Sequence, residues 1–252
     1  MTELAYLADL PSAYVREFRA RITARPPGGL VLDRTYFYPV GGGQPADHGT
    51  LRVGPDRTVD VVDVTKSGPA AIHRIRARGG ADVAFVVGAE VEGSIDWARR
   101  YRHMRLHTAQ HFLSARVFAR TGVRTRRALL GGSGATIDLE RPVPPALLGP
   151  LAEDLAEALA RPRPVSLRAG PRGEWDANPF AGRSGLVPLP PQVDPVRVVM
   201  IEEWDACPCG GTHVRSTAEI GAIELRPLAP LPDGAMRVAF TLADDGRATP
   251  TG

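Results

Sequence analysis

Hydrophobic and polar residues alternate in short runs between residues 29 and 96, and turn-forming residues separate the runs. A period of two residues is typical of half-buried strands, whereas amphipathic helices repeat every 3.6 residues. Short strands joined by glycine- and proline-containing turns predict a small antiparallel barrel or a curled sheet. The four runs are GLVLDRTYFY at 29–38, TVDVVDV at 58–64, AAIHRIRA at 70–77 and ADVAFVVGAEVEGSID at 81–96.

The pattern changes after Trp97 to one typical of a helix. The segment 99–120 contains neither Gly nor Pro, and its apolar residues lie three or four positions apart. Gly122 follows as a plausible helix stop, because glycine accepts the left-handed conformation that ends many helices. The sequence therefore predicts one helix over this segment. Its apolar stripe consists of Leu106, Ala109, Leu113 and Val117.

The remainder of the chain mixes strand-like runs with a second helix. Leu151, Leu155 and Leu159 have helical spacing, and Pro150 suits the first turn of a helix. Six prolines and three glycines in residues 171–195 predict a long surface loop. The strand-like runs are at 134–140, 196–204, 221–228 and 236–243.

Together these patterns predict an α+β protein, in which a small N-terminal β-barrel precedes an α+β domain. We place the barrel at residues 1–98, the α+β domain at 99–242 and a flexible tail at 243–252. The chain has 252 residues, of which 43% are hydrophobic and 23% are charged, as in an ordinary globular protein. No apolar run is long enough to span a membrane, and the N-terminus does not look like a secretory signal. We therefore expect a cytoplasmic protein.

The net charge of +3 is unevenly distributed. Residues 99–140 contain nine arginines and two acidic residues, whereas the segments on either side are mildly acidic. Arginine favours bidentate contacts with phosphate groups, although a G+C-rich coding sequence also produces such a bias. The single lysine, Lys66, lies outside any P-loop motif, which argues against nucleotide hydrolysis by that route.

Two pairs of metal-binding residue types repeat the same spacing. His107 and His111 lie four residues apart on the predicted helix, and Cys209 and His213 lie four residues apart in a glycine-rich segment. One thiolate and three imidazoles suit Zn²⁺. Either pair alone is a weak signal, since two histidines on a helix are more often ordinary polar residues. Cys207 is either a bystander thiol or a competing ligand, because it lies two residues from Cys209.

These two motifs do not match the sequence signatures of two other classes of zinc enzyme. A zincin protease needs H-E-x-x-H, with the glutamate as general base, whereas residues 107–111 read HTAQH. A base deaminase needs P-C-x-x-C, whereas Pro208 and Cys209 are followed by GGTH. Both interpretations therefore lack residues that their chemistry requires.

Three separated segments, in the same order, resemble the AlaX family, the freestanding relatives of the editing domain of alanyl-tRNA synthetase. The segments are LDRTYFYPVGGGQPADHG at 32–49, GSIDWARRYRHMRLHTAQHFLSA at 93–115 and CGGTHVRSTAEIG at 209–221. The resemblance implies a cytosolic deacylase that hydrolyses tRNA(Ala) carrying serine or glycine, acting in trans. In that family the motifs found here at His107, His111, Cys209 and His213 hold Zn²⁺, and the barrel with its GGGQ loop is similar to that of the medium-length type.

A tRNA partner also explains features outside the metal motifs. The loop of Gly41, Gly42, Gly43 and Gln44 could cradle the acceptor end through backbone N–H groups, although a tight turn between strands explains it equally well. The basic segment offers arginines to the phosphates of tRNA. These are Arg99, Arg100, Arg102, Arg105, Arg116, Arg120, Arg124, Arg126 and Arg127.

The catalytic groups are not assigned by these motifs. Thr108, Gln110 and Thr212 are candidate hydrogen-bond partners for the substrate, and Gln110 stands where the synthetase commonly has Thr. Four protein ligands are typical of a structural zinc site, whereas catalytic zinc keeps one position open. Zinc therefore either activates water after one ligand leaves or only orients the substrate. Two other functions fit the sequence: a zinc-stabilised RNA-binding protein without catalysis, and an editing deacylase of different amino-acid specificity.

Overall fold

The computed structural model describes residues 1–54, 57–78, 85–131, 134–182, 184 and 189–243. The chain divides into two compact units, of which the first is essentially Met1–Arg102 and the second begins at His103. Each unit is described by itself below. The expected boundary between residues 98 and 99 stays a prediction. Among the helices of the described residues, none has the length and apolar character needed to cross a membrane.

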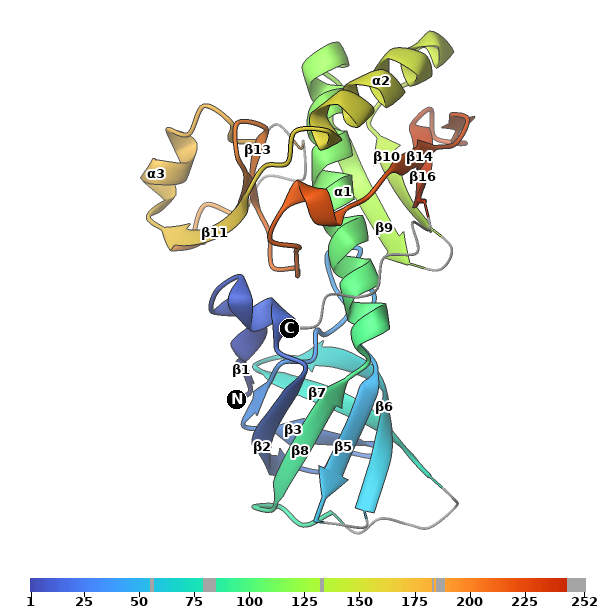
Figure 1. The fold of residues 1–252 in the computed structure, drawn as a ribbon. Coiled ribbons are helices and arrows are strands. Elements are labelled where there is room, and N and C mark those ends of the chain that lie inside the picture. Colours follow the sequence, from blue (N-terminus) through green and yellow to red (C-terminus); the bar gives the residue numbers. More distant parts are fainter. Residues whose placement is uncertain (55–56, 79–84, 132–133, 183, 185–188, 244–252) are drawn as a thin grey trace. The chain divides into compact units, whose positions relative to one another are not determined.

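The first unit contains a closed barrel of six antiparallel strands, as the alternating pattern predicts (Figure 1). In order around the barrel these are β2 (Glu17–Ala24), β3 (Gly29–Leu32), β7 (Ala70–Ala77), β6 (Arg57–Ser67), β5 (Gly49–Val53) and β8 (Glu90–Ile95). The chain before the barrel contains β1 (Glu3–Leu4), η1 (Ala5–Leu7) and η2 (Pro11–Tyr14), and β1 pairs in parallel with β4 (Arg34–Thr35).

Strands β2 and β5 lie outside the four predicted runs, although β2 alternates clearly. Phe18, Ala20 and Ile22 point into the barrel core, and the residues between them are exposed. Gly93 of β8 lies opposite Phe18, and a Cβ atom at Gly93 would come within 2.5 Å of the Phe18 ring. The barrel therefore needs glycine at this position for the phenylalanine to enter the core.

Helix α1 (Trp97–Thr121) agrees with the helix predicted over residues 99–120. Asp96 caps its start, because Asp96 Oδ1 accepts a hydrogen bond from the backbone N–H of Arg99 (3.1 Å). Gly122 follows its end with a φ of 65° and donates its N–H to the carbonyl of Phe118. Both ends of the helix are thus determined by local sequence.

The second unit contains two sheets and a second long helix. One sheet has the order β14 (Ile223–Leu225), β16 (Met236–Leu242), β10 (Gly134–Leu139) and β9 (Thr125–Gly131), with β15 (Ala229–Pro230) beside β16. The other sheet is β11 (Val165–Gly170), β12 (Val196–Ile201) and β13 (Asp205–Pro208). The short helix η3 (Pro145–Leu147) precedes α2 (Leu148–Leu159), which buries Leu151 and Leu155 as predicted. The short helix η4 (Thr217–Glu219) lies between β13 and β14.

The segment predicted as a long surface loop, 171–195, is partly structured. It begins with α3 (Arg172–Asp176), and Ala181 forms a parallel bridge with Ala206 of β13. The backbone of Ala206 pairs with this segment on both sides of the bridge. Residues 180–182 therefore pair with the edge of β13, although the composition of this segment indicates only a loop. Residues 183 and 185–188 of this segment, and most of the expected tail, lie outside the described residues.

Candidate metal centre

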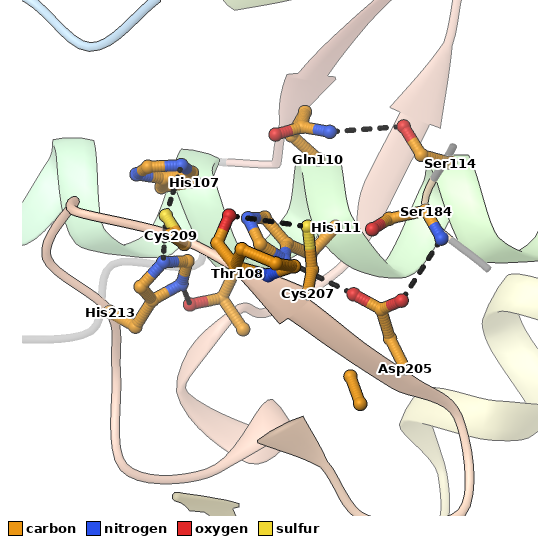
Figure 2. Close-up of polar contacts among 12 residues, drawn as sticks. His107, Thr108, Gln110, His111, Ser114, Ser184, Asp205, Cys207, Cys209 and His213 are labelled. Carbon is orange, nitrogen blue, oxygen red and sulfur yellow. Dashed lines mark hydrogen bonds and ion pairs between the residues drawn. The ribbon is translucent and has the colours of Figure 1, made fainter. Parts of the chain in front are cut away.

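The four predicted ligand residues come together in the second unit (Figure 2). His107 and His111 project from one face of α1, and Cys209 and His213 come from the loop that follows β13. One donor atom from each residue lies within 4.8 Å of the other three. Cys209 Sγ is 3.5 Å from His107 Nε2 and 3.3 Å from His213 Nε2. A tetrahedral zinc ion, with bonds of about 2.0 to 2.3 Å, separates its ligand atoms by roughly 3.5 Å.

The three histidines of the cluster are shielded from solvent, and the cysteine is not. His107, His111 and His213 are each at most 2% exposed, whereas Cys209 is of intermediate exposure. The loop that carries Cys209 is held from β12, because the backbone N–H of Cys209 donates to the carbonyl of Arg197 (3.2 Å) and the Arg197 guanidinium donates back to Cys209 O. A molecule entering from solvent would therefore approach on the Cys209 side.

Thr108 determines the orientation of His213. Its single hydroxyl hydrogen is donated to the carbonyl of Met104 (3.0 Å), so Thr108 Oγ1 acts as an acceptor for its other neighbours. Those neighbours are His213 Nδ1 (3.1 Å) and the backbone N–H of Val214 (3.2 Å). His213 must then carry its proton on Nδ1, which leaves the Nε2 lone pair facing Cys209.

Asp205 forms a hydrogen bond with Nδ1 of His111, as Thr108 does with Nδ1 of His213. The sequence analysis did not identify Asp205. Asp205 Oδ2 lies 3.2 Å from His111 Nδ1, and both residues are buried. The other ring nitrogen, Nε2, is buried and has no hydrogen-bond partner among the described residues. The only sequence signal for Asp205 is an acidic residue at the end of an apolar run, shortly before the cysteines.

The electrostatics of the cluster favour the metal-binding protonation state at Cys209 and His213, but not at His111. Burial raises the pKa of Cys209, but the neighbouring imidazoles of His107 and His213 outweigh it and hold the pKa well below its usual value. Burial and repulsion from His107 lower the pKa of His213 to about 3. Burial also lowers the pKa of His111, but its hydrogen bond to Asp205 and the nearby Cys209 outweigh this and raise it to about 10. Binding of a cation at His111 therefore requires the release of a proton.

Cys207 has a different environment from Cys209. It is 2% exposed, and its thiol lies 3.6 Å from the carbonyl of Pro208. Burial, reinforced by the charge of Asp205, raises the pKa of Cys207 well above its usual value, so the thiol stays protonated. Cys207 is outside the four-residue cluster, although its Sγ lies within 4.8 Å of donor atoms of His111 and Asp205.

Comparisons with known proteins match both units. The family of class II tRNA synthetases (A) matches residues 10–99, and the second additional domain of threonyl and alanyl tRNA synthetases matches residues 196–230. The alanyl-tRNA editing protein AlaX-M of Methanosarcina barkeri is 33% identical over 250 residues, which cover 97% of this chain and 100% of that protein. The chain belongs to the AlaX-M family. The AlaX-M protein of Methanosarcina acetivorans is equally similar, at 33% identity over 248 residues.

Alanine–tRNA ligases also match this chain. The ligase of Pyrobaculum neutrophilum is 33% identical over 267 residues, which cover 95% of this chain. The chain spans only 28% of the length of that ligase. The similarity thus concerns one region of a much longer protein.

The other candidate substrate-binding residues of this AlaX-M chain lie outside the cluster. Gln110 Nε2 donates to Ser114 Oγ (3.0 Å), as Figure 2 shows. Ser114 Oγ also accepts from Thr125 Oγ1 (2.8 Å), so the three residues form a buried polar chain. Thr212 is 1% exposed within the loop that carries Cys209 and His213. Thr108 contacts the cluster through its hydrogen bond with His213.

Arg100 was expected to bind phosphate, and this expectation is wrong. Its side chain is completely buried and forms an ion pair with Asp47. It also donates to the carbonyls of Ala13 (2.7 Å) and Tyr36. The sequence could not reveal this role, because Asp47 lies 53 residues away and the pairing depends on the fold of the first unit.

Most of the other expected arginines have partners within the chain. Arg116 and Arg120 pair with Asp154, Arg126 pairs with Asp233, Arg105 donates to the carbonyl of Ile220 and Arg99 to that of Ala46, while Arg102 is partly buried. Arg124 and Arg127 are exposed, and neither has a carboxylate partner within the described part of the chain. The guanidinium of Arg124 lies 5.0 Å from the ring centroid of Phe118. These two arginines are the most available to an anionic ligand.

The GGGQ segment of the first unit is a tight turn. Gly41 and Gln44 exchange backbone hydrogen bonds of 3.1 and 2.9 Å, and Gly42 and Gly43 have positive φ angles of 56° and 83°. Two successive positive φ angles define a hairpin turn that favours glycine. The N–H groups of Gly41 and Gln44 are therefore used within the turn and are not available to a tRNA end.

Proposed function

We propose that this chain removes the wrong amino acid from tRNA(Ala), by hydrolysing the ester of Ser-tRNA(Ala) and Gly-tRNA(Ala) after the synthetase has released it. The observation that supports this best is the 33% identity over the full length of the AlaX-M protein of Methanosarcina barkeri. Its name states an alanyl-tRNA editing activity. The cluster of His107, His111, Cys209 and His213 supplies a site with donor groups for such chemistry.

We propose that these four residues hold Zn²⁺. The fit rests on three observations: one thiolate with three imidazoles, sulfur–nitrogen separations of 3.3 and 3.5 Å, and a buried His111 Nε2 without a hydrogen-bond partner among the described residues. When bound, zinc would act as a Lewis acid that polarises the ester carbonyl or orients the substrate. Thr108 holds His213 with its Nε2 toward the centre and is thus a positioning residue.

The substrate would enter on the Cys209 side, where the cluster is least buried. Three buried histidines exclude water from the opposite side. We propose that Arg124 and Arg127, at the start of β9, bind tRNA phosphates, since they lack carboxylate partners in the described chain. A substrate of this kind places the protein in the cytoplasm.

Recognition of the wrong amino acid imposes two different demands on the pocket. Serine can be bound through its hydroxyl group, whereas glycine lacks the alanine methyl group and can be favoured only by steric exclusion of that methyl. A pocket that accepts both residues must therefore combine a hydrogen-bonding group with a narrow wall. We expect faster hydrolysis of the serine ester than of the glycine ester, because only the former gains a hydrogen bond.

The test is a panel of four substrates: Ser-tRNA(Ala), Gly-tRNA(Ala), Ala-tRNA(Ala) and Ser-tRNA(Thr). We expect hydrolysis of the first two and at least tenfold lower kcat/KM for Ala-tRNA(Ala). Hydrolysis of Ser-tRNA(Thr) alone would indicate an editing deacylase of different specificity. Binding of tRNA without hydrolysis of any ester would indicate an RNA-binding protein. His107→Ala, which removes one proposed ligand, serves as the inactive control.

A further inference from the structure

Asp205 is a buried carboxylate directly behind one of the proposed ligands (Figure 2). We propose that Asp205 is a positioning residue, which holds His111 in the tautomer that binds the metal and supplies a second negative charge to the centre. This inference rests on the proposed zinc site and extends it to a residue outside the four-residue cluster. Its support comes from the contacts, the charge count and the packing of the second unit.

Both oxygens of Asp205 have donors. Oδ2 accepts from His111 Nδ1 (3.2 Å), and Oδ1 accepts from the backbone N–H of Ser184 (3.0 Å). Asp205 is 1% exposed, and an ionised carboxylate at such a position needs either hydrogen bonds or a positive partner. With its Nδ1–H donated to Asp205, His111 keeps that proton when a metal binds and releases the one on Nε2, so that Nε2 becomes the ligand atom.

The charge count explains why a carboxylate is useful here. One thiolate from Cys209 and three neutral imidazoles leave a divalent cation with a net charge of +1 in a buried site. A second negative charge on Asp205 reduces the net charge to zero. Isolated charge is costly in a buried environment, so this neutralisation strengthens metal binding. Neutral Thr108, which orients His213, cannot provide it.

The position of Asp205 is fixed by its neighbours in the second unit. Trp204 packs on Phe112 of α1, with ring centroids 4.5 Å apart, and the Arg116 guanidinium lies 4.7 Å from the Trp204 ring centroid. Phe112 directly follows His111, so this contact places the end of the β12–β13 turn beside the ligand. The bridge between Ala181 and Ala206 brings the Ser184 segment to the other side of Asp205.

A direct ligand role for Asp205 is the competing interpretation, because its oxygen lies within 4.8 Å of donor atoms of His111 and Cys207. The contacts favour a role through His111, since both carboxylate oxygens are already acceptors.

Asp205→Asn tests the proposal with almost no change in shape. An asparagine has one acceptor oxygen, and if this serves Ser184 N–H, the NH₂ group faces His111 Nδ1. His111 must then keep its proton on Nε2, the atom that would bind zinc. We expect zinc affinity, measured by competition with a chromophoric chelator, to fall about 10- to 100-fold. Asp138→Asn is the matched control, since Asp138 is a buried carboxylate that pairs with Arg237. The zinc affinity of this variant should equal that of the wild type.

A second measurement uses the unchanged protein and covers the case in which Asp205→Asn does not fold. In the zinc-loaded wild type, ¹⁵N NMR of the imidazoles should show His111 protonated on Nδ1. Absence of that proton, or an Asp205→Asn affinity within twofold of the wild type, would overturn the role of Asp205 and leave the zinc site intact. If the wild type itself binds no zinc, the proposed metal centre fails, and this inference fails with it.

Discussion

Thr108 Oγ1 lies 3.1 Å from Nδ1 of His213, although 105 residues separate the two in the chain. Thr108 belongs to the same helical turn as the histidine pair, so one short stretch of α1 supplies two proposed ligands and also orients a third. The second motif, CGGTH, thus contacts the first through a hydrogen bond as well as through the proposed shared ion. This relationship leads to the first prediction.

Thr108→Val should weaken zinc binding. Valine has nearly the same shape but no acceptor, so the buried Nδ1–H of His213 and the N–H of Val214 both lose their partner. Each unsatisfied buried donor costs about 1–3 kcal/mol, and loss of such an orienting partner reduces metal affinity by about tenfold or more. Chelator competition measures the effect. Thr108→Ser keeps the hydroxyl and should bind zinc as the wild type does; equal affinities for all three proteins would disprove the role of Thr108.

The two cysteines should behave differently when each is replaced by alanine. Cys209→Ala removes the thiolate of the cluster, so the purified protein should contain little zinc and hydrolyse no Ser-tRNA(Ala). Cys207→Ala removes a protonated thiol outside the four-residue cluster and should retain one zinc per chain. Metal content by mass spectrometry and deacylation on the same samples test both. Loss of zinc only with Cys207→Ala would show that the ligand assignment is wrong.

Replacement of both Arg124 and Arg127 by alanine should weaken tRNA binding without altering zinc content. Each phosphate contact that is lost lowers the salt dependence of binding, so the slope of log K against log salt should fall by about 2 in magnitude. KM should rise, whereas kcat should change little. Arg25→Ala with Arg74→Ala removes the same charge from exposed positions of the barrel unit. An identical loss of affinity in this control would indicate a general charge effect.

Arg100→Ala should impair stability. The substitution leaves Asp47 as a buried charge without its partner and removes the donor to the carbonyl of Ala13. Breaking a buried ion pair in this way costs about 3–5 kcal/mol of unfolding free energy. Urea denaturation measures this loss. A variant as stable as the wild type, with weakened tRNA binding, would instead restore the role in phosphate binding that the sequence predicted.

His73 makes the stability of the barrel unit depend on pH. It is buried between Thr35 and the carbonyl of Leu30, and burial lowers its pKa from 6.5 to about 4. The unfolded chain therefore binds the proton more readily, so the contribution of His73 is complete above pH 6.5 and is lost as the pH falls toward 4. The total loss is about 3 kcal/mol. An NMR titration should place the imidazole midpoint near pH 4, and a midpoint near 6.5 would contradict the prediction.

The sequence by itself determined the features that depend on neighbouring residues. Helical spacing places His107 and His111 on one face of α1, and Asp96 and Gly122 set its ends. Alternation predicts the barrel strands β3, β6, β7 and β8, because side chains of a strand point to opposite faces in turn. The same rule applied to residues 17–24 would have predicted β2 as well.

Only the tertiary structure decided which distant residues meet. The role of Asp205 depends on its approach to His111 across 94 residues of chain, and the role of Arg100 depends on Asp47. Burial by the rest of the fold then sets the pKa values of Cys207 and Cys209 in opposite directions, although the two residues are nearly adjacent. The charge and hydrogen-bonding state of a side chain depend on what surrounds it in space, and spacing along the chain does not contain that information.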